Sequence, residues 1–450
     1  MINAQIFRQY DIRGIVGEDL TDESMYLIGK GFGSYLRKKG LSSVVLGGDA
    51  RLSTPGFIAE FSRGLVSTGC DVIKIGIVAT PVLYFAIWKL QTDGGAMITA
   101  SHNPSQYNGI KLNMGLGSVY AEELQKVLKI IQTDDYEVGE GFISQYTGID
   151  DEYMNYLVDN IKLERPVRLV VDGGNGMGGP YLPKVLRRLG CEVEEIYTDP
   201  DGTFPNHHPD PTVEKYMKDL SAKVVQGSYE LGIGLDGDAD RIGVVDEKGK
   251  MLFGDQILNI LARDYLAKNP GKAIIADVKC SKNLYDDIRK HGGEPIMYKT
   301  GHANIKMRMK EIGVEFAGEM SGHVFLADRY LGFDDAIYVS ARFAEIVSKT
   351  NGPVSSYLAD QPKMYNTPEL HIPCADDKKF EVVAAVCNEF KAENYDVNDI
   401  DGARITFEDG WGLVRASNTT PVLVTRYEAT SEARMKEIQE LIENKIKKYL

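Results

Sequence analysis

The chain is organised around the stretch Gly95-Ala-Met-Ile-Thr-Ala-Ser-His-Asn-Pro-Ser105. Its apolar first half predicts a strand, which must end at the Ser-His-Asn-Pro segment because proline cannot donate a hydrogen bond to a sheet. A hydroxyl at a strand end suits a nucleophile if a base or cation activates it. Ser101 has His102 beside it and Lys111 a little further along. The alternative is an ordinary strand end with a capping serine.

Around this stretch, strands alternate with helices in the way that is typical of βαβ units. Residues 44–99 predict three apolar strands separated by two helices, and the same order recurs at residues 168–235 and 273–317. In each repeat the last strand ends in an unusual polar loop. Ligands of open parallel sheets gather at the carboxyl ends of the strands, so three such loops could face one cleft.

The last part of the chain has a different pattern. Helical periodicity at residues 381–391 and 431–449 flanks several short strand-like runs, which predicts a smaller α+β domain. We therefore expect an α/β protein with three similar α/β domains, built on mixed or parallel sheets, and a C-terminal α+β domain. The expected domains are residues 1–147, 148–249, 250–364 and 365–450.

The composition limits the partners and the compartment. The formal net charge is −14, which argues against nucleic acid or an anionic membrane, so an anionic substrate would need a local cationic pocket. The five cysteines form no C-x-x-C pair, no secretory leader pattern opens the sequence, and no apolar run approaches the length of about 18 residues that spans a membrane. We expect a cytoplasmic protein with reduced thiols and no membrane segment.

The second repeat ends in the acidic loop Asp236-Gly-Asp-Ala-Asp-Arg241. Gly237 would let the loop curl so that Asp236, Asp238 and Asp240 converge, and three carboxylates with room for water or phosphate suit Mg²⁺. Arg241 occupies the sixth position, where a calcium loop of the EF-hand type has glycine. The alternative is a solvated acidic turn.

Two further loops offer groups that could bind a phosphorylated sugar. The first, Gly318-Glu-Met-Ser-Gly-His323, combines a carboxylate and a hydroxyl, which can bond adjacent sugar hydroxyls, with an imidazole. The second, Arg415-Ala-Ser-Asn-Thr-Thr-Pro421, combines a guanidinium fork with hydroxyl and amide donors. The second loop is the cationic pocket that the net charge requires. A turn with a structural histidine and a polar hairpin loop are the respective alternatives.

Together, five motifs resemble the α-D-phosphohexomutase superfamily, and within it the bacterial phosphomannomutase/phosphoglucomutase branch. The resemblance covers essentially the whole chain, and Gly48 stands where a basic residue is common in the family. The motifs, in family order, are Tyr10-Asp-Ile-Arg-Gly14, Thr99-Ala-Ser-His-Asn-Pro104, Asp236-Gly-Asp-Ala-Asp-Arg241, Gly318-Glu-Met-Ser-Gly-His323 and Arg415-Ala-Ser-Asn-Thr-Thr-Pro421.

The resemblance implies four domains around a central cleft and a specific reaction. A phosphorylated Ser101 would give its phosphoryl group to a hexose phosphate, and the resulting bisphosphorylated sugar would turn around and return its other phosphate. Hexose 1,6-bisphosphate would act as the activator. Mg²⁺ would be held by Ser101, Asp236, Asp238 and Asp240. The other implied catalytic residues are Arg13, His102, Lys111 and Arg241.

The remaining implied residues contact the substrate. Glu319 and Ser321 would bind two sugar hydroxyls with His323 close by, and the Arg415 loop would hold the non-reacting phosphate. The full set of substrate-binding residues is Tyr10, Lys279, His302, Glu319, Ser321, His323, Arg415, Ser417, Asn418 and Thr419.

The sugar and the oligomeric state are less closely defined by the motifs. Met320 resembles the mannose and glucose branch, whereas the glucosamine branch usually has glutamine there. Phosphoglucosamine mutase is therefore the second hypothesis, followed by a Mg²⁺-dependent sugar phosphatase and a catalytically silent sugar-phosphate sensor. We expect a monomer or a homodimer.

Overall fold

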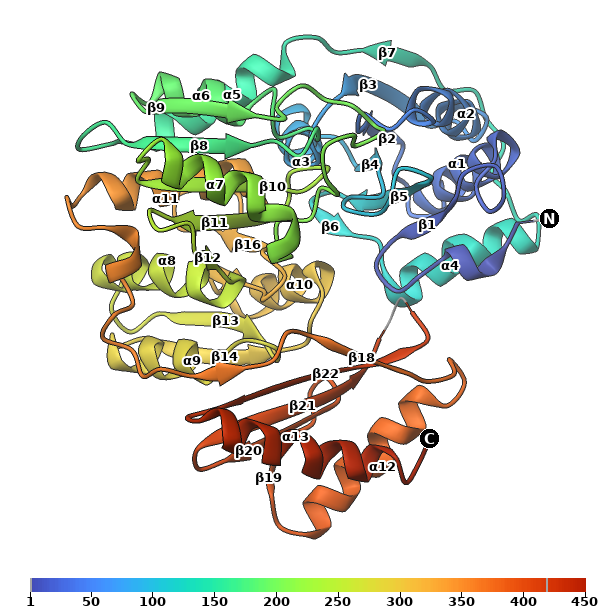
Figure 1. Ribbon diagram of the computed structural model, residues 1–450. Helices are drawn as coiled ribbons and strands as arrows, with labels where there is room; N and C mark the ends of the chain where they lie inside the picture. The colour runs from blue at the N-terminus through green and yellow to red at the C-terminus, as the bar shows by residue number, and fades with distance from the viewer. Residues whose placement is uncertain (1, 418–419) are drawn as a thin grey trace. The chain divides into compact units, whose positions relative to one another are not determined.

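The computed structural model describes residues 2–417 and 420–450 (Figure 1). The chain forms two compact units. The first contains the residues up to Ile257 together with Ser321–Tyr357, and the second contains Leu258–Met320 together with Leu358–Leu450. No helix in the described part of the chain combines the length and the apolar character needed to cross a membrane.

The first sheet lies in the first unit and is mixed. β2 pairs in parallel with β3 and β4, whereas β5 runs antiparallel to both β4 and β1. The strands, in the order of the sheet, are β1 (Ile12–Ile15), β5 (Tyr107–Met114), β4 (Gly94–Ile98), β2 (Ser43–Gly48), β3 (Asp71–Ile77) and β7 (Ile143–Gln145), with β6 (Gly117–Ser118) beside β5. The helices of this region are η1 (Ala4–Ile6), α1 (Asp22–Arg37), α2 (Thr54–Val66), α3 (Thr80–Leu90) and α4 (Ala121–Gln132).

The second sheet carries the acidic loop between two antiparallel strands, β10 and β11. Its strands, in order, are β12 (Met251–Leu252), β11 (Ile242–Asp246), β10 (Leu231–Leu235), β8 (Arg168–Asp172) and β9 (Glu192–Ile196). The helices are α5 (Ile149–Asn160), α6 (Leu182–Arg188), η2 (Glu214–Met217) and α7 (Lys218–Gln226). α7 directly follows the 3₁₀ turn η2.

An aromatic cluster explains why residues 321–357 belong to the first unit. The ring of Tyr84 on α3 lies 5.2 Å from that of Phe333, and the Tyr153 hydroxyl on α5 donates to Asp335 at 2.8 Å. Asp335 also caps α11 (Ala336–Ser348) by accepting from the amide of Tyr338. The other elements of this segment are β16 (Val324–Leu326) and η3 (Val354–Ser356).

The second unit contains a parallel sheet and the C-terminal α+β region. β13 (Ala273–Asp277) pairs in parallel with β14 (Glu294–Tyr298) and β15 (Phe316–Gly318), next to α9 (Lys282–Lys290) and α10 (His302–Ile312). α8 (Gly254–Lys268) precedes this sheet in the chain.

The C-terminal region is an antiparallel sheet whose one face is covered by two helices (Figure 1). Apolar side chains of both helices, including Phe390 and Ile442, form its core against strand residues such as Ile405. The strands, in order, are β17 (Tyr365–Asn366), β22 (Val422–Ala429), β21 (Gly410–Ala416), β20 (Ala403–Phe407) and β19 (Asp396–Asn398), with β18 (Leu370–Pro373) beside β22, and the helices are α12 (Lys379–Ala392) and α13 (Glu432–Ile446). The predicted fold class, three α/β regions followed by an α+β region, is confirmed.

Candidate active site

Ser101 lies just beyond the end of β4 in a backbone conformation that serine rarely adopts. Its φ is +51°, in the left-handed region, and its residue surface is 1% exposed. The Ser101 hydroxyl donates to Asp236 Oδ2 at 2.8 Å and lies 3.1 Å from His102 Nδ1. The serine singled out in the sequence therefore lies directly against the acidic loop.

The three aspartates of the acidic loop converge, as expected. One carboxylate oxygen from each of Asp236, Asp238 and Asp240 lies within 4.8 Å of the others, and all three residues are buried. The curl is made by Ala239, whose φ is +64°. Gly237 contributes in another way, because a Cβ there would lie 2.5 Å from the carbonyl oxygen of Ser101. The expectation that Gly237 supplies the curl was wrong, and its role is to permit close approach.

The surrounding donors occupy both oxygens of Asp236 but only one oxygen of Asp238 and one of Asp240. Asp236 Oδ1 accepts from the amides of Asp240 and Arg241 at 3.0 and 3.1 Å. Asp238 Oδ2 accepts from Thr80 Oγ1 and Lys111 Nζ, both at 2.6 Å, and Lys111 also bonds Asp240.

The other oxygens of Asp238 and Asp240 point to a cation. Within residues 2–417 and 420–450, Oδ1 of each is buried and has no hydrogen-bond partner. Burial, and then the charges of Asp240 and Asp238, raise the pKa of Asp236 well above its usual range. Buried carboxylate oxygens without donors are unfavourable unless an ion binds them. The hard oxygen donors of this loop fit a divalent cation such as Mg²⁺.

The surroundings of His102 favour its neutral form. Burial, followed by the charges of Arg241 and Arg13, lowers its pKa well below the usual value. A neutral imidazole whose Nδ1 lies 3.1 Å from the Ser101 oxygen can accept the hydroxyl proton once that hydroxyl rotates away from Asp236.

The two predicted catalytic arginines, Arg13 and Arg241, have defined partners. Arg13 on β1 donates to Asp11 at 2.8 Å and to Asn103 at 2.6 Å. Arg241 Nε donates to His323 Nε2 at 3.0 Å. His323 Nδ1 in turn lies 3.3 Å from Asp334 Oδ2. Asp334 was not identified in the sequence, because it belongs to none of the five motifs.

Two predicted substrate-binding residues of the second unit, Glu319 and Lys279, are buried and hydrogen-bonded. Glu319 is buried and accepts from the amide of Gly301 at 2.6 Å. Lys279 is buried and donates to Glu369 at 2.7 Å. Although burial raises the pKa of Glu369, the Lys279 ammonium lowers it to about 2.

The Arg415 loop is anchored by an aspartate that sequence reasoning missed. Arg415 Nε donates to Asp401 Oδ2 at 3.1 Å, and the same oxygen accepts from the amide of Thr300 at 3.0 Å. Ser417 shares a hydrogen bond with the Thr420 hydroxyl at 2.8 Å. Asn418 and Thr419 lie outside the described residues.

The remaining predicted residues are partly buried. His302 is the first residue of α10 in the second unit. Tyr10, in the first unit, has its ring 6.5 Å from that of Tyr120. Ser321 lies in the first unit, two residues before His323.

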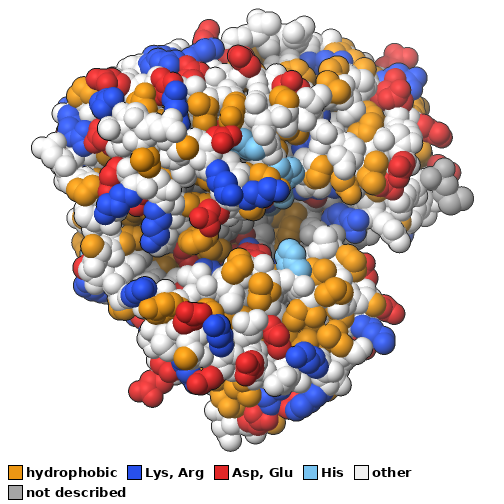
Figure 2. Space-filling model, viewed as in Figure 1, with side chains coloured by type: hydrophobic (Ala, Val, Ile, Leu, Met, Phe, Trp, Pro, Cys, Tyr) orange, Lys and Arg blue, Asp and Glu red, His pale blue; other side chains and the backbone are white. Residues whose placement is uncertain are grey.

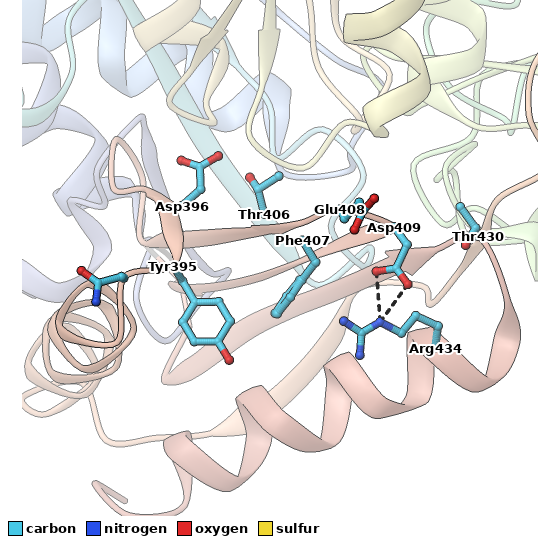
Figure 3. Close-up of a pocket in the computed structure, with 9 residues that line it drawn as sticks. Tyr395, Asp396, Thr406, Phe407, Glu408, Asp409, Thr430 and Arg434 are labelled. Carbon is cyan, nitrogen blue, oxygen red and sulfur yellow. Dashed lines mark hydrogen bonds and ion pairs between the residues drawn. The ribbon is translucent and has the colours of Figure 1, made fainter.

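A separate pocket of about 720 Å³ lies in the C-terminal region (Figure 3). It is lined by acidic and aromatic side chains, and its arginine, Arg434, donates to Asp409 at 3.0 Å. None of the predicted site residues within residues 2–417 and 420–450 lines it. On the face shown in Figure 2, acidic and basic side chains are interspersed.

Comparison with known protein families identifies the family of this chain. Four models of one family match it in order: "Phosphoglucomutase/phosphomannomutase, alpha/beta/alpha domain I" at residues 4–137, domain II at residues 151–249, domain III at residues 253–365 and the C-terminal domain at residues 369–445. The chain belongs to the phosphoglucomutase/phosphomannomutase family. The resemblance deduced from the five motifs is confirmed.

Individual relatives cover nearly the whole chain. A phosphomannomutase/phosphoglucomutase of Pseudomonas aeruginosa is 43% identical over 99% of this chain and 96% of its own length. A phosphoglucomutase of Neisseria meningitidis is 44% identical over 97% of this chain and 96% of its own length. A crystal structure of a phosphoglucomutase/phosphomannomutase family protein from Burkholderia thailandensis has 41% identity and a TM-score of 0.94, covering 100% of this chain and 98% of that one.

Proposed function

We propose that this family member is a phosphohexomutase that interconverts the 1-phosphates and 6-phosphates of glucose and mannose. The observation that carries the proposal is the buried Ser101 hydroxyl, 2.8 Å from Asp236 in a loop of three converging carboxylates. Relatives that are named for both sugars, together with Met320 in the sugar loop, support glucose and mannose as substrates.

We propose that Ser101 carries the transferred phosphoryl group. His102 is placed to accept the proton of the Ser101 hydroxyl, and Lys111 balances the charge of Asp238 and Asp240. Arg241 and Arg13 add positive charge beside the transferring group. Mg²⁺ bound by Ser101, Asp236, Asp238 and Asp240 would neutralise charge on the phosphoryl oxygens, which phosphoryl transfer requires more than covalent chemistry.

In this proposal, the other residues hold the sugar phosphate in either orientation. Glu319 and Ser321 bind sugar hydroxyls with His323 nearby, and Arg415 and Ser417 bind the phosphate that does not react. Tyr10, Lys279, His302, Asn418 and Thr419 complete the substrate contacts. A bisphosphorylated hexose forms and then reverses its orientation before it returns a phosphate to Ser101, so hexose 1,6-bisphosphate would activate the enzyme.

We also propose a cytoplasmic enzyme, because its substrates are phosphorylated sugars and its five cysteines are buried free thiols. It would act as a monomer or homodimer, with domain boundaries after residues 147, 249 and 364.

Phosphorus NMR tests the function directly. The protein is supplied with Mg²⁺, a trace of hexose 1,6-bisphosphate, and the 1-phosphate of mannose, glucose or glucosamine in separate samples. Conversion to the 6-phosphate of glucose and mannose is the expected result. Faster conversion of glucosamine 1-phosphate would favour a phosphoglucosamine mutase, accumulating inorganic phosphate a phosphatase, and no turnover of any sugar a binding protein.

A further inference from the structure

Arg51 is a buried arginine whose side chain donates to the backbone of the segment that carries Ser101. Its Nη2 donates to the carbonyl oxygens of Ser101 and Asn103 at 2.8 and 2.6 Å. Its Nη1 donates to those of Pro104 and Tyr107 at 2.7 and 2.8 Å. Its Nε donates to Asp49 at 3.2 Å. All five N–H groups of the guanidinium are therefore used, four of them on one loop.

The other side of the same loop is fixed through Asp49. Asp49 Oδ2 accepts from the Thr99 hydroxyl at 2.7 Å, and Thr99 Oγ1 accepts from the amide of Ser101 at 2.9 Å. Asp49 Oδ1 also accepts from the amide of Arg51 and from the Thr54 hydroxyl, each at 3.0 Å. The carbonyl and the amide of Ser101 are thus both held by one buried Asp49–Arg51 pair.

This support matters because Ser101 has a strained backbone. A φ of +51° is unfavourable for serine and persists only where the surroundings impose it. The four carbonyl oxygens that converge on Arg51 impose it, while the Ser101 side chain bonds Asp236.

We propose that Arg51 is a positioning residue that holds the strained Ser101 loop in the geometry needed for phosphoryl transfer. The inference rests on the proposed mutase function. Lysine cannot replace Arg51, because an ammonium has three donors on a single atom and cannot reach four carbonyl oxygens and a carboxylate together.

The chain offers a matched control in Arg165, which also combines carbonyl acceptors with a carboxylate. It donates to the carbonyl oxygens of Pro166, Val347 and Thr350 and to Glu230. Arg165→Lys thus removes a similar set of hydrogen bonds away from Ser101.

The experiment compares Arg51→Lys with Arg165→Lys in kcat, KM, melting temperature and amide exchange of residues 101–107. We expect Arg51→Lys to lower kcat about 100-fold with little change in KM, because small displacements of reacting groups have effects of that size. Amide exchange should accelerate in residues 101–107 of this variant alone. Arg51→Ala should regain part of its kcat in millimolar guanidinium, whereas Arg165→Ala should not respond.

A kcat for Arg51→Lys equal to that of the wild type, or a loss matched by Arg165→Lys, would overturn the proposal. If Arg51→Lys does not fold, the guanidinium rescue of Arg51→Ala decides: a kcat that rises with guanidinium supports the proposal, and a kcat that guanidinium leaves unchanged overturns it. An inactive wild-type protein would instead refute the mutase function.

Discussion

The two groups of site residues differ in how their charges are balanced. In the first unit, Asp238 and Asp240 share Lys111, Asp238 also accepts from Thr80, and Asp236 accepts from backbone amides and from the Ser101 hydroxyl. In the second unit, two predicted substrate-binding cations each pair with a carboxylate: Lys279 with Glu369, and Arg415 with Asp401.

This difference suggests separate roles for the two groups of residues, one in the chemical step and the other in substrate binding. In the proposed function, the first-unit network is preorganised to hold a cation and a phosphoryl group, so its disruption should affect the chemical step. In the proposed function, an incoming phosphate replaces the carboxylates that pair with Lys279 and Arg415 in the second unit. Changes there should mainly affect binding.

The largest effect is expected for Ser101→Ala. Because the variant lacks the oxygen that carries the phosphoryl group, kcat should fall by at least about 1,000-fold, while sugar-phosphate binding measured by calorimetry without Mg²⁺ should be retained. Ser105→Ala, an exposed serine in the same segment, is the control and should keep the wild-type kcat. Near-normal turnover of Ser101→Ala would remove this residue from the centre of the reaction.

Asp238→Asn tests the cation site itself. Since Asp238 contributes a buried oxygen without a hydrogen-bond partner among the described residues, its loss should weaken Mn²⁺ binding, followed by electron paramagnetic resonance, at least about 100-fold. Thr80→Val removes only the hydroxyl that orients Asp238 and should weaken binding about tenfold. Equal Mn²⁺ affinity in the wild type and both variants would locate the metal elsewhere.

Arg415→Ala should act on affinity. Loss of a charged hydrogen bond to phosphate should weaken sugar-phosphate binding by about 1.5–3 kcal/mol, with little effect on the melting temperature. The control is Arg434→Ala in the same C-terminal region, because Arg434 pairs with Asp409 in the separate pocket (Figure 3). If Arg415→Ala and Arg434→Ala bind equally well, the phosphate does not bind at the Arg415 loop.

The order of the elements and the polar loops could be predicted from the sequence because both are local patterns. Strand and helix periodicity predicted the repeats, and the spacing of Asp236, Asp238 and Asp240 predicted a cluster. β5 was not predicted, although it is an interior strand that pairs with both β1 and β4. Its buried side chains include Asn108, Lys111 and Asn113, and such polar residues hide the apolar pattern of a buried strand.

The residues that support the site could not be predicted, because their partners are distant in the chain. Thr80 bonds Asp238, and Arg51 bonds the Ser101 loop, over separations of 158 and 50 residues. Asp401 and Glu369 were missed for a related reason: each is an ordinary acidic residue until the fold places it beside a cation.

The smallest predicted effect is that of Glu369→Gln. It tests the difference between the two groups of site residues most directly, because this substitution should improve substrate binding. Glu369 lies 2.7 Å from Lys279, and its side chain is 34% exposed, so solvent screens the pair. Glu369→Gln removes the charge that an incoming phosphate must displace, and the Kd for glucose 6-phosphate, measured by calorimetry, should fall about two- to fivefold. The gain should shrink at high salt.

Asp360→Asn provides the control for a general change in net charge, because Asp360 pairs with Arg263 and Lys290 in the same unit. It should leave the Kd unchanged. A weaker Kd for Glu369→Gln would mean that Glu369 holds Lys279 in place for the phosphate, and the counter-charge would then belong to the binding site itself. The second unit would in that case be preorganised in the same way as the loop around Ser101.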